Sequence, residues 1–402
     1  MPGGRRQRRG SLVVRVSVPG KLFLAGEYAI VEPAHSAVLV AVDRFLTVEL
    51  TATDGEASGG EGLGGEELGG VVESSEYGAN PLKWHHTKKA AADTTAAAVE
   101  FLGERRDYVT AALQTCEKLR AERGISPRGY DLTITSKLNG DNGDKLGLGS
   151  SGAVVVAIVA ALSEHYGMGL STAERFKVAL LAAAQISPQG SGGDIAASTL
   201  GGWIHYRSPD RRQVLEDYAT GSVSAALSSR GWHGSAAYSL PAPKQTHLLV
   251  GWTKAPALTD KLVANLQQRT PRNSPVYADF LTTSEHAVTE LVTGIVTDNG
   301  EQISGAIELA RQNLATLSDA AAITIETPAL QQMRELAAAV GVAAKTSGAG
   351  GGDCAIALPA DPAKHDAVAA AWQRANISVL DLSVAGATDG AGQIGSGESF
   401  EL

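Results

Sequence analysis

The chain has 402 residues and is 44% hydrophobic, which is enough to bury the cores of two ordinary domains. Its formal net charge of -9 at pH 7 argues against general affinity for nucleic acid, so nucleic acid is not expected as a partner. The two cysteines, Cys116 and Cys354, are too few for a disulfide scaffold, so we expect reduced thiols in a cytoplasmic protein. No uninterrupted apolar run is long enough to predict a membrane span.

The first half of the chain alternates between strand and helix patterns. Residues 1–10 are basic and polar, and they predict a disordered tail. Alternating apolar residues predict a strand over 11–19, and a Pro-Gly turn then places Lys21 at the start of a second, buried strand. Further patterns predict strands at 37–51, 131–135 and 203–206, two helices within 90–123 with a break near Gly103, and a helix over 171–184.

The most informative stretch joins the strand at 131–135 to a long segment rich in alanine and valine. That apolar segment predicts a buried helix that begins near Ser150. The stretch carries three glycines and two serines: Gly147, Gly149, Gly152, Ser150 and Ser151. A helix start has unpaired backbone N–H groups and a positive dipole end, and glycines let an anion come close to that backbone. The stretch therefore predicts an anion-binding helix N-terminus, and it favours a nucleotide phosphate as the ligand.

The glycine spacing alone fits more than one class of site. It matches the G-x-G-x-x-G pattern of dinucleotide-binding turns and, with Val154, the glycine loop of protein kinases. A protein kinase is excluded because neither His-Arg-Asp nor Asp-Phe-Gly occurs in the chain. A dinucleotide turn is disfavoured because residues 136–145 separate the strand from the glycines. A glycine-rich turn that only caps a core helix is the remaining alternative.

A second glycine and serine cluster runs from Ser187 to Ser198 and includes Asp194, just before an apolar helix start. This aspartate is either a plain helix cap or a functional carboxylate. A third cluster runs from Lys345 to Cys354, with four glycines in the five residues from Gly348. So many glycines are costly in chain entropy, and a close backbone approach to a ligand or to another segment would justify them.

The composition changes near Pro241, which predicts a domain boundary there. The second half then predicts strands at 247–253, 355–358 and 379–384, and helices at 260–268, 280–296, 302–317, 327–340 and 361–375. Residues 386–402 are rich in glycine and serine and predict a flexible tail. The domains predicted in this way are residues 11–240 and 241–385.

Four motifs, in this order, resemble those of the GHMP kinase family. They are Pro19-Gly20-Lys21 through Gly26-Glu27-Tyr28, Gly147 to Gly152, Gly190 to Asp194, and Ser347 to Asp353. Each motif is weak alone, but the order is specific, and the match covers nearly the whole folded chain. Glu27-Tyr28-Ala29, Gly251-Trp252-Thr253-Lys254 and Gly350 to Cys354 are most similar to the bacterial branch that phosphorylates 5-phosphomevalonate.

The resemblance implies an α+β fold of two domains with the active site in the cleft between them. The N-terminal domain would be ribosomal protein S5 domain 2-like, with a left-handed βαβ crossover, and would bind ATP; the C-terminal domain would be ferredoxin-like. The implied reaction is ATP-dependent phosphorylation of 5-phosphomevalonate to 5-diphosphomevalonate, in the mevalonate pathway of isoprenoid biosynthesis. Mevalonate kinase, phosphomevalonate decarboxylase and a non-catalytic sensor on the same scaffold are the alternatives. A monomer or homodimer that binds only small molecules is expected.

The resemblance also implies roles for particular residues. Lys21, Lys145 and Asp194 would be catalytic, with Lys145 reaching the transferring phosphoryl group and Lys21 pairing with Asp194. ATP phosphates would be held by Gly147, Leu148, Gly149, Ser150, Ser151 and Gly152, and Mg²⁺ by the hydroxyl of Ser150 or Ser151. The acceptor would be bound by Lys21, Glu27, Tyr28, Ser191, Gly192, Thr259, Ser347, Gly348 and Gly350. Lys254 would be a third lysine near the acceptor.

Two departures from the family pattern affect these implied roles. Mevalonate kinases place a glutamate that binds Mg²⁺ eleven residues before the aspartate of the Gly190 to Asp194 motif, and this chain has Ala183 there. Mg²⁺ would then be held by ATP phosphates, water and one serine. Many members also have a proline shortly before the Gly-Leu-Gly segment, and here residues 139–144 replace it.

Overall fold

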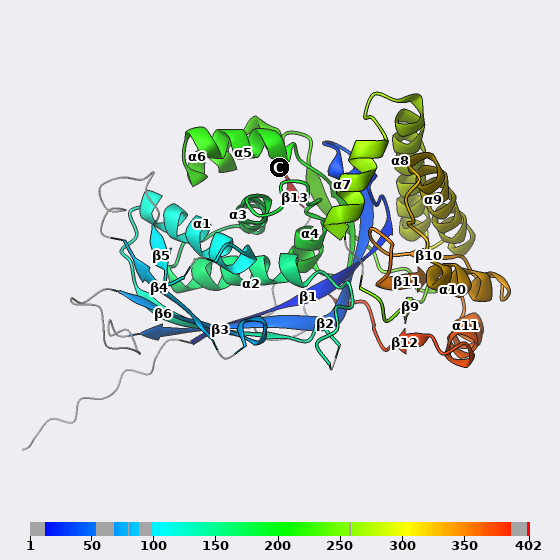
Figure 1. The fold of residues 1–402 in the computed structure, drawn as a ribbon, viewed down its shortest axis with the longest axis horizontal. Helices are drawn as coiled ribbons and strands as arrows, with labels where there is room; N and C mark the ends of the chain where they lie inside the picture. Colours follow the sequence, from blue (N-terminus) through cyan, green and yellow to red (C-terminus); the bar gives the residue numbers. More distant parts are fainter. Residues whose placement is uncertain are drawn as a thin grey trace, which may run out of the picture.

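The computed structural model describes residues 13–53, 68–78, 80–87, 98–103, 105–140, 142–256, 259–386 and 400–402. The predicted tail at 1–10 and most of the one at 386–402 lie outside these residues. The described chain forms a larger α/β part and a smaller part that packs beside it (Figure 1).

The larger part is built on one sheet, which has nine strands among the described residues. Its order is β13-β8-β7-β2-β6-β3-β4-β5, and β1 also pairs with β2. The strands are β1 (Val13–Ala25), β2 (Ser36–Thr53), β3 (Gly69–Ser74), β4 (Leu82–His86), β5 (Val99–Phe101), β6 (Gly129–Ser136), β7 (Trp203–Arg207), β8 (Ala236–Leu240) and β13 (Phe400–Glu401). The long strand β2 is the centre, because its first half pairs with β7, its second half with β6, and both halves with β1.

The predicted turn at Pro19-Gly20 is wrong, because β1 runs through this pair and continues through Lys21 to Ala25. The register against β2 shifts between Pro19 and Gly20, where the extra residues Asp43 and Arg44 lie on β2. Such an irregularity bends the strand that carries the extra residues. Gly20 itself lies so close to the glycine stretch that a Cβ at this position would be 2.9 Å from the Leu148 carbonyl oxygen.

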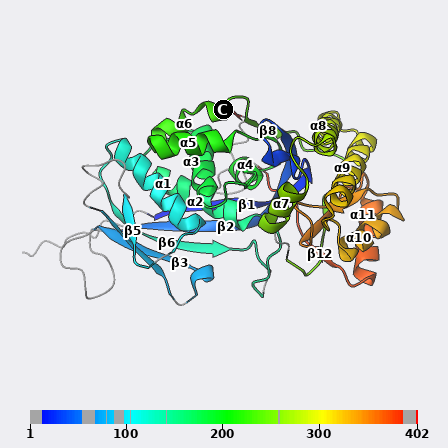
Figure 2. The ribbon, with the colours of Figure 1, turned by 45° about the horizontal axis from the view of Figure 1, so that its top comes forward.

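Helices cover one face of this sheet (Figures 1 and 2). They are α1 (Tyr108–Glu122), α2 (Ser150–His165), α3 (Thr172–Ala184), α4 (Gly193–Leu200), α5 (Arg211–Thr220) and α6 (Val223–Leu227). Helix α2 is buried along nearly its whole length and packs on β1, β2, α1, α3 and α4, as its apolar sequence predicts. Of the two helices predicted within 90–123, the second is confirmed as α1. The first predicted helix is wrong over its last residues, because β5 occupies residues 99–101. The earlier residues, 88–97, lie outside the described chain.

The smaller part is a four-stranded antiparallel sheet with helices. Its strands are β9 (Leu249–Trp252), β10 (Ala344–Thr346), β11 (Cys354–Ala357) and β12 (Ser378–Leu380), in the order β10-β11-β9-β12. Its helices are α7 (Thr259–Arg269), α8 (Pro275–Val296), α9 (Gly300–Ala321), α10 (Pro328–Ala338) and α11 (Pro362–Arg374). Short 3-10 turns lie at Ala29–Val31, Ser75–Tyr77 and Arg230–Trp232. This strand order, with helices after β9 and β11, is the ferredoxin-like arrangement that the resemblance implied.

The last described residues are ordered, unlike the flexible tail predicted for 386–402. Phe400 and Glu401 form β13, which pairs with β8 at the edge of the large sheet. The Phe400 side chain is only 9% exposed, and its ring centroid lies 5.2 Å from that of Phe176 in α3. The Phe400 ring therefore packs these residues against α3, in addition to the backbone pairing of β13 with β8.

We expect Phe400→Ala to lower the free energy of unfolding of the N-terminal part by ~2–4 kcal/mol, because it removes a buried aromatic ring. Urea denaturation followed by fluorescence measures this loss. Val13→Ala is the control, since Val13 is a strand residue that is 56% exposed and its truncation should have little effect. Equal effects of the two substitutions would show that β13 contributes no packing energy.

Candidate functional site

A cleft of about 480 Å³ lies where the two parts meet. Both parts contribute its lining residues: Lys21, Phe23, Tyr108, Leu138, Asn139, Lys145, Gly147, Leu148, Gly149, Ser150, Ser151, Ser187, Gly190, Ser191, Asp194, Ser347, Gly348, Ala349 and Asp353. Segments from β1, the α2 and α4 starts and the β10–β11 loop, far apart in the sequence, therefore meet in one space. All three glycine clusters reach it.

The glycine turn is held in place by Lys21. The backbone N–H of Lys21 donates to the Leu148 carbonyl oxygen at 2.9 Å, and its ammonium Nζ donates to the Gly147 carbonyl oxygen at 2.7 Å. Gly147 and Gly149 have φ angles of 74° and 80°, in the left-handed region that favours glycine. Gly149 is the N-cap of α2 and gives it no side-chain cap. The first N–H groups of α2 therefore face the cleft beside a lysine charge.

Asp194 lies on the other side of the same turn. It is the second residue of α4, whose N-cap is Gly192, so the simple capping role considered for Asp194 is not the one observed. A Cβ at Gly152 would lie 2.5 Å from the Asp194 carboxyl, so Gly152 is required by packing against that group. Burial raises the pKa of the Asp194 carboxyl above its ordinary value, and the nearby Lys21 charge opposes part of the rise.

The opposite wall of the cleft comes from the smaller part. Ser347, Gly348 and Ala349 form it, and it faces Ser191 from the loop before α4. The hydroxyl oxygen of Ser347 accepts the backbone N–H of Phe23 in β1 at 2.9 Å. This bond joins the two parts at the edge of the cleft.

Several residues expected to bind the acceptor do not line this cleft. Glu27 is 4% exposed and is paired with Lys345, while Tyr28 is 3% exposed and donates its hydroxyl to the Ala349 carbonyl oxygen at 2.5 Å. Gly350 is packed against the segment between α9 and α10, where a Cβ would lie 2.3 Å from the Ile325 carbonyl oxygen. Gly192 is likewise confined by Leu180. Buried contacts hold these residues behind the cleft walls. They support the walls and do not line the cleft.

Lys254 and Thr259 were also expected to lie near the acceptor. Lys254 is exposed and is not among the residues that line the cleft, so its place near the acceptor stays a prediction. The backbone of Thr259 begins α7, and its side chain lies outside the described part of the structure.

The cleft includes residues that the sequence patterns did not single out as site residues. Tyr108 begins α1, and no motif marks it. Asp353 ends the third glycine cluster, and its carboxyl oxygen Oδ2 lies 2.6 Å from the position that a Cβ would take at Gly147. Its φ of 53° is unusual for an aspartate, and such conformations concentrate at functional sites. Its place at the end of the Ser347 to Asp353 motif was the sequence signal for Asp353.

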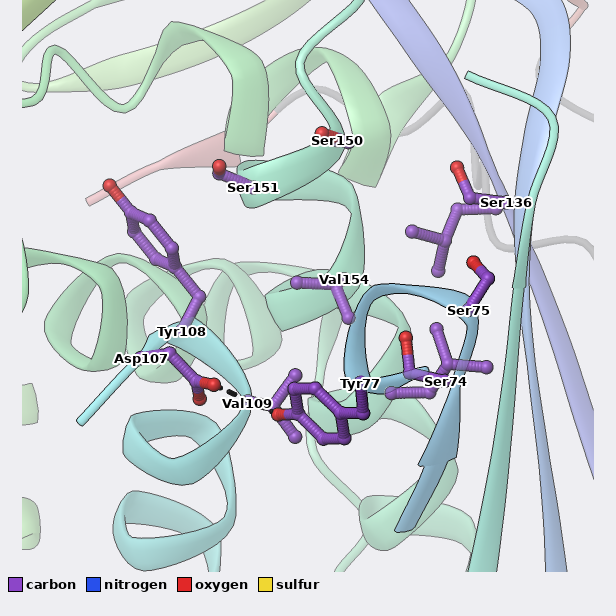
Figure 3. A pocket seen from close by; sticks show the side chains of 12 residues that line it. Ser74, Ser75, Tyr77, Asp107, Tyr108, Val109, Ser136, Ser150, Ser151 and Val154 are labelled. Atoms are coloured by element: carbon purple, nitrogen blue, oxygen red, sulfur yellow. Dashed lines mark hydrogen bonds between the residues drawn. The ribbon is translucent and has the colours of Figure 1, made fainter. Parts of the chain in front are cut away.

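A smaller pocket of about 70 Å³ adjoins the cleft and shares Tyr108, Ser150 and Ser151 with it. Figure 3 shows the two serines at the start of α2 and Tyr77 and Val154 on the walls below them. The Tyr77 hydroxyl donates to the Asp107 carboxylate at 2.9 Å, which fixes this ring beside the pocket. A third cavity of about 40 Å³ lies behind Asp194 and is lined in part by Ala183.

The cleft offers few protein ligands for a metal ion. No group of three or more histidine, cysteine, aspartate or glutamate side chains is gathered for a metal anywhere in the described residues. The hydroxyls of Ser150 and Ser151 and the carboxylate of Asp194 are the hard oxygen donors in the cleft nearest the α2 start. This donor set fits a Mg²⁺ ion that keeps most of its coordination for water and phosphate oxygens.

A helix start that can bind an anion faces a ferredoxin-like domain across a cleft that carries lysines. This arrangement defines the class of protein, the two-domain small-molecule kinases. Residues 107–202 match the family model of the GHMP kinases N terminal domain, and residues 301–378 match that of GHMP kinases C terminal. The chain belongs to the GHMP kinase family. None of the helices in the described ranges is long and apolar enough to cross a membrane.

Three relatives illustrate the similarity. A phosphomevalonate kinase of Streptomyces sp. (strain CL190) is 41% identical, over 91% of this chain and 96% of its own. The Lin0012 protein from Listeria innocua has a solved structure with a TM-score of 0.81 and 29% identity, covering 92% of this chain and 97% of its own. The structure of Streptococcus pneumoniae phosphomevalonate kinase in complex with phosphomevalonate and AMPPNP has a TM-score of 0.74 and 27% identity, covering 92% and 99%.

We expect Gly149→Val to abolish ATP binding, because the new side chain would collide with Lys21 and Asp194 at the α2 start. A Cβ at Gly149 would already lie 2.9 Å from Lys21 Cγ and 3.2 Å from Asp194 Cβ. Isothermal titration calorimetry measures the affinity. Gly167→Val is the matched control: its φ is also positive, at 61°, and no atom lies within 4 Å of its Cβ position. Wild-type affinity in folded Gly149→Val protein would refute the phosphate site.

We expect Asp194→Asn to stabilise the protein near neutral pH. Because its pKa is raised in the folded protein, the Asp194 carboxyl contributes stability that is fully present below its unfolded pKa and is lost as the pH rises through the folded pKa. The asparagine keeps the shape without the charge, so the gain in Tm should be present at pH 7.5 and shrink toward pH ~4. Scanning calorimetry across this range measures it. Asp381→Asn, at an exposed carboxyl, should show no such trend.

Proposed function

We propose that this protein is an ATP-dependent kinase that phosphorylates 5-phosphomevalonate to 5-diphosphomevalonate. The observation that carries the proposal is the convergence of all three glycine clusters on one cleft with Lys21 and Lys145. The chain is 41% identical to a phosphomevalonate kinase, and a solved relative binds phosphomevalonate together with AMPPNP, an ATP analogue. The mevalonate pathway is the setting that this reaction implies.

The nucleotide would lie along the α2 start. Its phosphates would meet the open N–H groups after Gly149 and the hydroxyls of Ser150 and Ser151. The smaller pocket in Figure 3 opens beside the same serines and has apolar walls, which suits a planar base. A nucleotide that spans the two cavities would place its terminal phosphate toward Lys21 and Asp194.

Phosphoryl transfer needs alignment and charge stabilisation more than covalent help. Lys145 lines the cleft at the turn, where its ammonium would offset charge on the moving phosphoryl group. Lys21 would act twice, because its hydrogen bond to Gly147 fixes the turn while its charge lies toward Asp194. Mg²⁺ on Ser150 or Ser151 would supply further neutralisation of phosphate charge when bound.

Asp194 would position the acceptor and Lys21 rather than remove a proton. A phosphate acceptor has a second pKa of about 6, so it is already largely ionised at neutral pH and needs no strong base. The Asp194 carboxyl is held beside Gly152 and accepts the N–H of Ile195 at 3.0 Å, which restricts its orientation. A fixed carboxylate next to a lysine is suited to hold that lysine in one place.

The acceptor would lie between Ser191 and the Ser347 to Ala349 wall. The start of α4 lies on this side, where the N–H groups of Gly193 and Ile195 donate to the Ser191 hydroxyl and the Asp194 carboxyl. Lys21 and Lys145 line the cleft and would carry the recognition of the acceptor phosphate. We further propose that the enzyme is cytoplasmic, is a monomer or homodimer, and takes small molecules rather than nucleic acid or membrane as partners.

We expect phosphomevalonate to be preferred over mevalonate by at least ~30-fold in kcat/KM, because lysines built for a phosphate stay unpaired with an alcohol acceptor, at a cost of ~2–5 kcal/mol. An assay of ADP release with mevalonate, phosphomevalonate and diphosphomevalonate, with carbon dioxide measured in parallel, tests this. Lys145→Met should slow turnover, whereas Lys254→Met should leave it near wild type.

Each alternative has its own result in this assay. Equal or faster turnover of mevalonate would identify a mevalonate kinase. Release of carbon dioxide with ADP would identify a decarboxylase. ATP binding without turnover of any acceptor would identify a sensor.

A further inference from the structure

Glu27 and Lys345 form an ion pair that is buried where the two parts of the molecule meet. Glu27 follows β1, and Lys345 lies in the middle of β10. Their side chains are 3% and 0% exposed, and the Lys345 ammonium donates to Glu27 Oε1. A pair so completely removed from water gains little net stability, because desolvation of both charges offsets their attraction. A gain in stability therefore does not explain why this ion pair is present.

The contacts around the pair lead directly to the acceptor wall. The Lys345 ammonium also donates to the Thr346 carbonyl oxygen at 2.6 Å, and Glu27 Oε1 accepts the N–H of Gly348 at 3.4 Å. One carboxylate oxygen thus holds both the strand and the first glycine of the wall. The other oxygen, Oε2, is buried and has no hydrogen-bond partner among the described residues.

Two further bonds fix the same wall from β1 and the turn after it. Phe23 donates its N–H to the Ser347 hydroxyl oxygen, and Tyr28 donates its hydroxyl to the Ala349 carbonyl oxygen. The residues so held, Ser347 to Ala349, line the cleft, whereas Glu27 and Lys345 do not. The wall contains Gly348 with a φ of 84° and open space around its Cβ position, so its own backbone does little to restrain it.

We propose that Glu27 and Lys345 are positioning residues that set the Ser347 to Ala349 wall for the phosphoryl acceptor and leave nucleotide binding unaffected. The pair contacts the wall from the smaller part, while the α2 start belongs to the larger part and is held by Lys21. This inference rests on the proposed function, since it assigns that wall to the acceptor.

The test compares Glu27→Gln, Lys345→Met and the double variant with wild type. Each single variant leaves one buried charge unpaired, so both should lose stability. The double variant removes both charges with little change of shape and should recover most of the Tm. Its acceptor kcat/KM should stay lower by ~10- to 100-fold, the scale of a misplaced reactant, while its Kd for ATP stays within ~3-fold of wild type.

Glu285→Gln is the matched control. Glu285, in α8, also joins the two parts, because it accepts the N–H of Ser36 at 3.1 Å, but it does not touch the wall. Its acceptor kinetics should match wild type. Amide hydrogen exchange of residues 347–350 adds a readout that needs no acceptor, and it should become faster in the double variant and stay unchanged in Glu285→Gln.

Recovery of acceptor kcat/KM together with Tm in the double variant would overturn the proposal, because the pair would then only fill space. A parallel fall in ATP affinity would overturn it as well, since the effect would reach the whole cleft. If wild type phosphorylates neither mevalonate nor phosphomevalonate, the proposed function fails. The exchange of residues 347–350 then decides the role of the pair by itself.

Discussion

The two hydrogen bonds from Lys21 to the glycine turn are the constraint on which the cleft depends. Gly20 lets β1 lie close to the turn, and Lys21 binds the Leu148 carbonyl with its backbone and the Gly147 carbonyl with its ammonium. The turn fixes the start of α2, and α2 packs on both β1 and β2. The position of the anion-binding end of the helix is therefore fixed relative to the central strands of the sheet.

The second half of the cleft is attached to the same strand. The end of β1 and the residues after it hold the β10–β11 loop through Phe23, Glu27 and Tyr28. One strand thus carries the phosphate side at its middle and the acceptor side at its end. The Cys354 thiol adds a further link between the two parts, because it donates to the Leu146 carbonyl oxygen at 3.2 Å. Alignment of two substrates across two domains is the requirement that such a kinase has to meet.

The glycines of the three clusters serve different purposes in the folded protein. Gly149 opens the α2 start to an anion, whereas Gly152 makes room for the Asp194 carboxyl. Gly350 and Gly192 allow close packing against buried neighbours, and neither lines the cleft. A glycine motif therefore marks a place where backbone comes close to something, and its partner can be a ligand or another part of the chain.

The sequence by itself determined the elements whose signals are local, such as the buried helix α2, the glycine turn before it and most helices of the second half. Helix period, apolar runs and left-handed glycines are properties of neighbouring residues, so they can be seen without the fold. Only the tertiary structure decided which motif residues face the cleft. Glu27 and Tyr28 are buried behind the cleft, and Lys254 is not among its lining residues. Tyr108 and Asp353 line the cleft, although no role was expected of them. The reason is that these positions depend on pairing between segments up to hundreds of residues apart, as with Glu27 and Lys345, which no local pattern encodes.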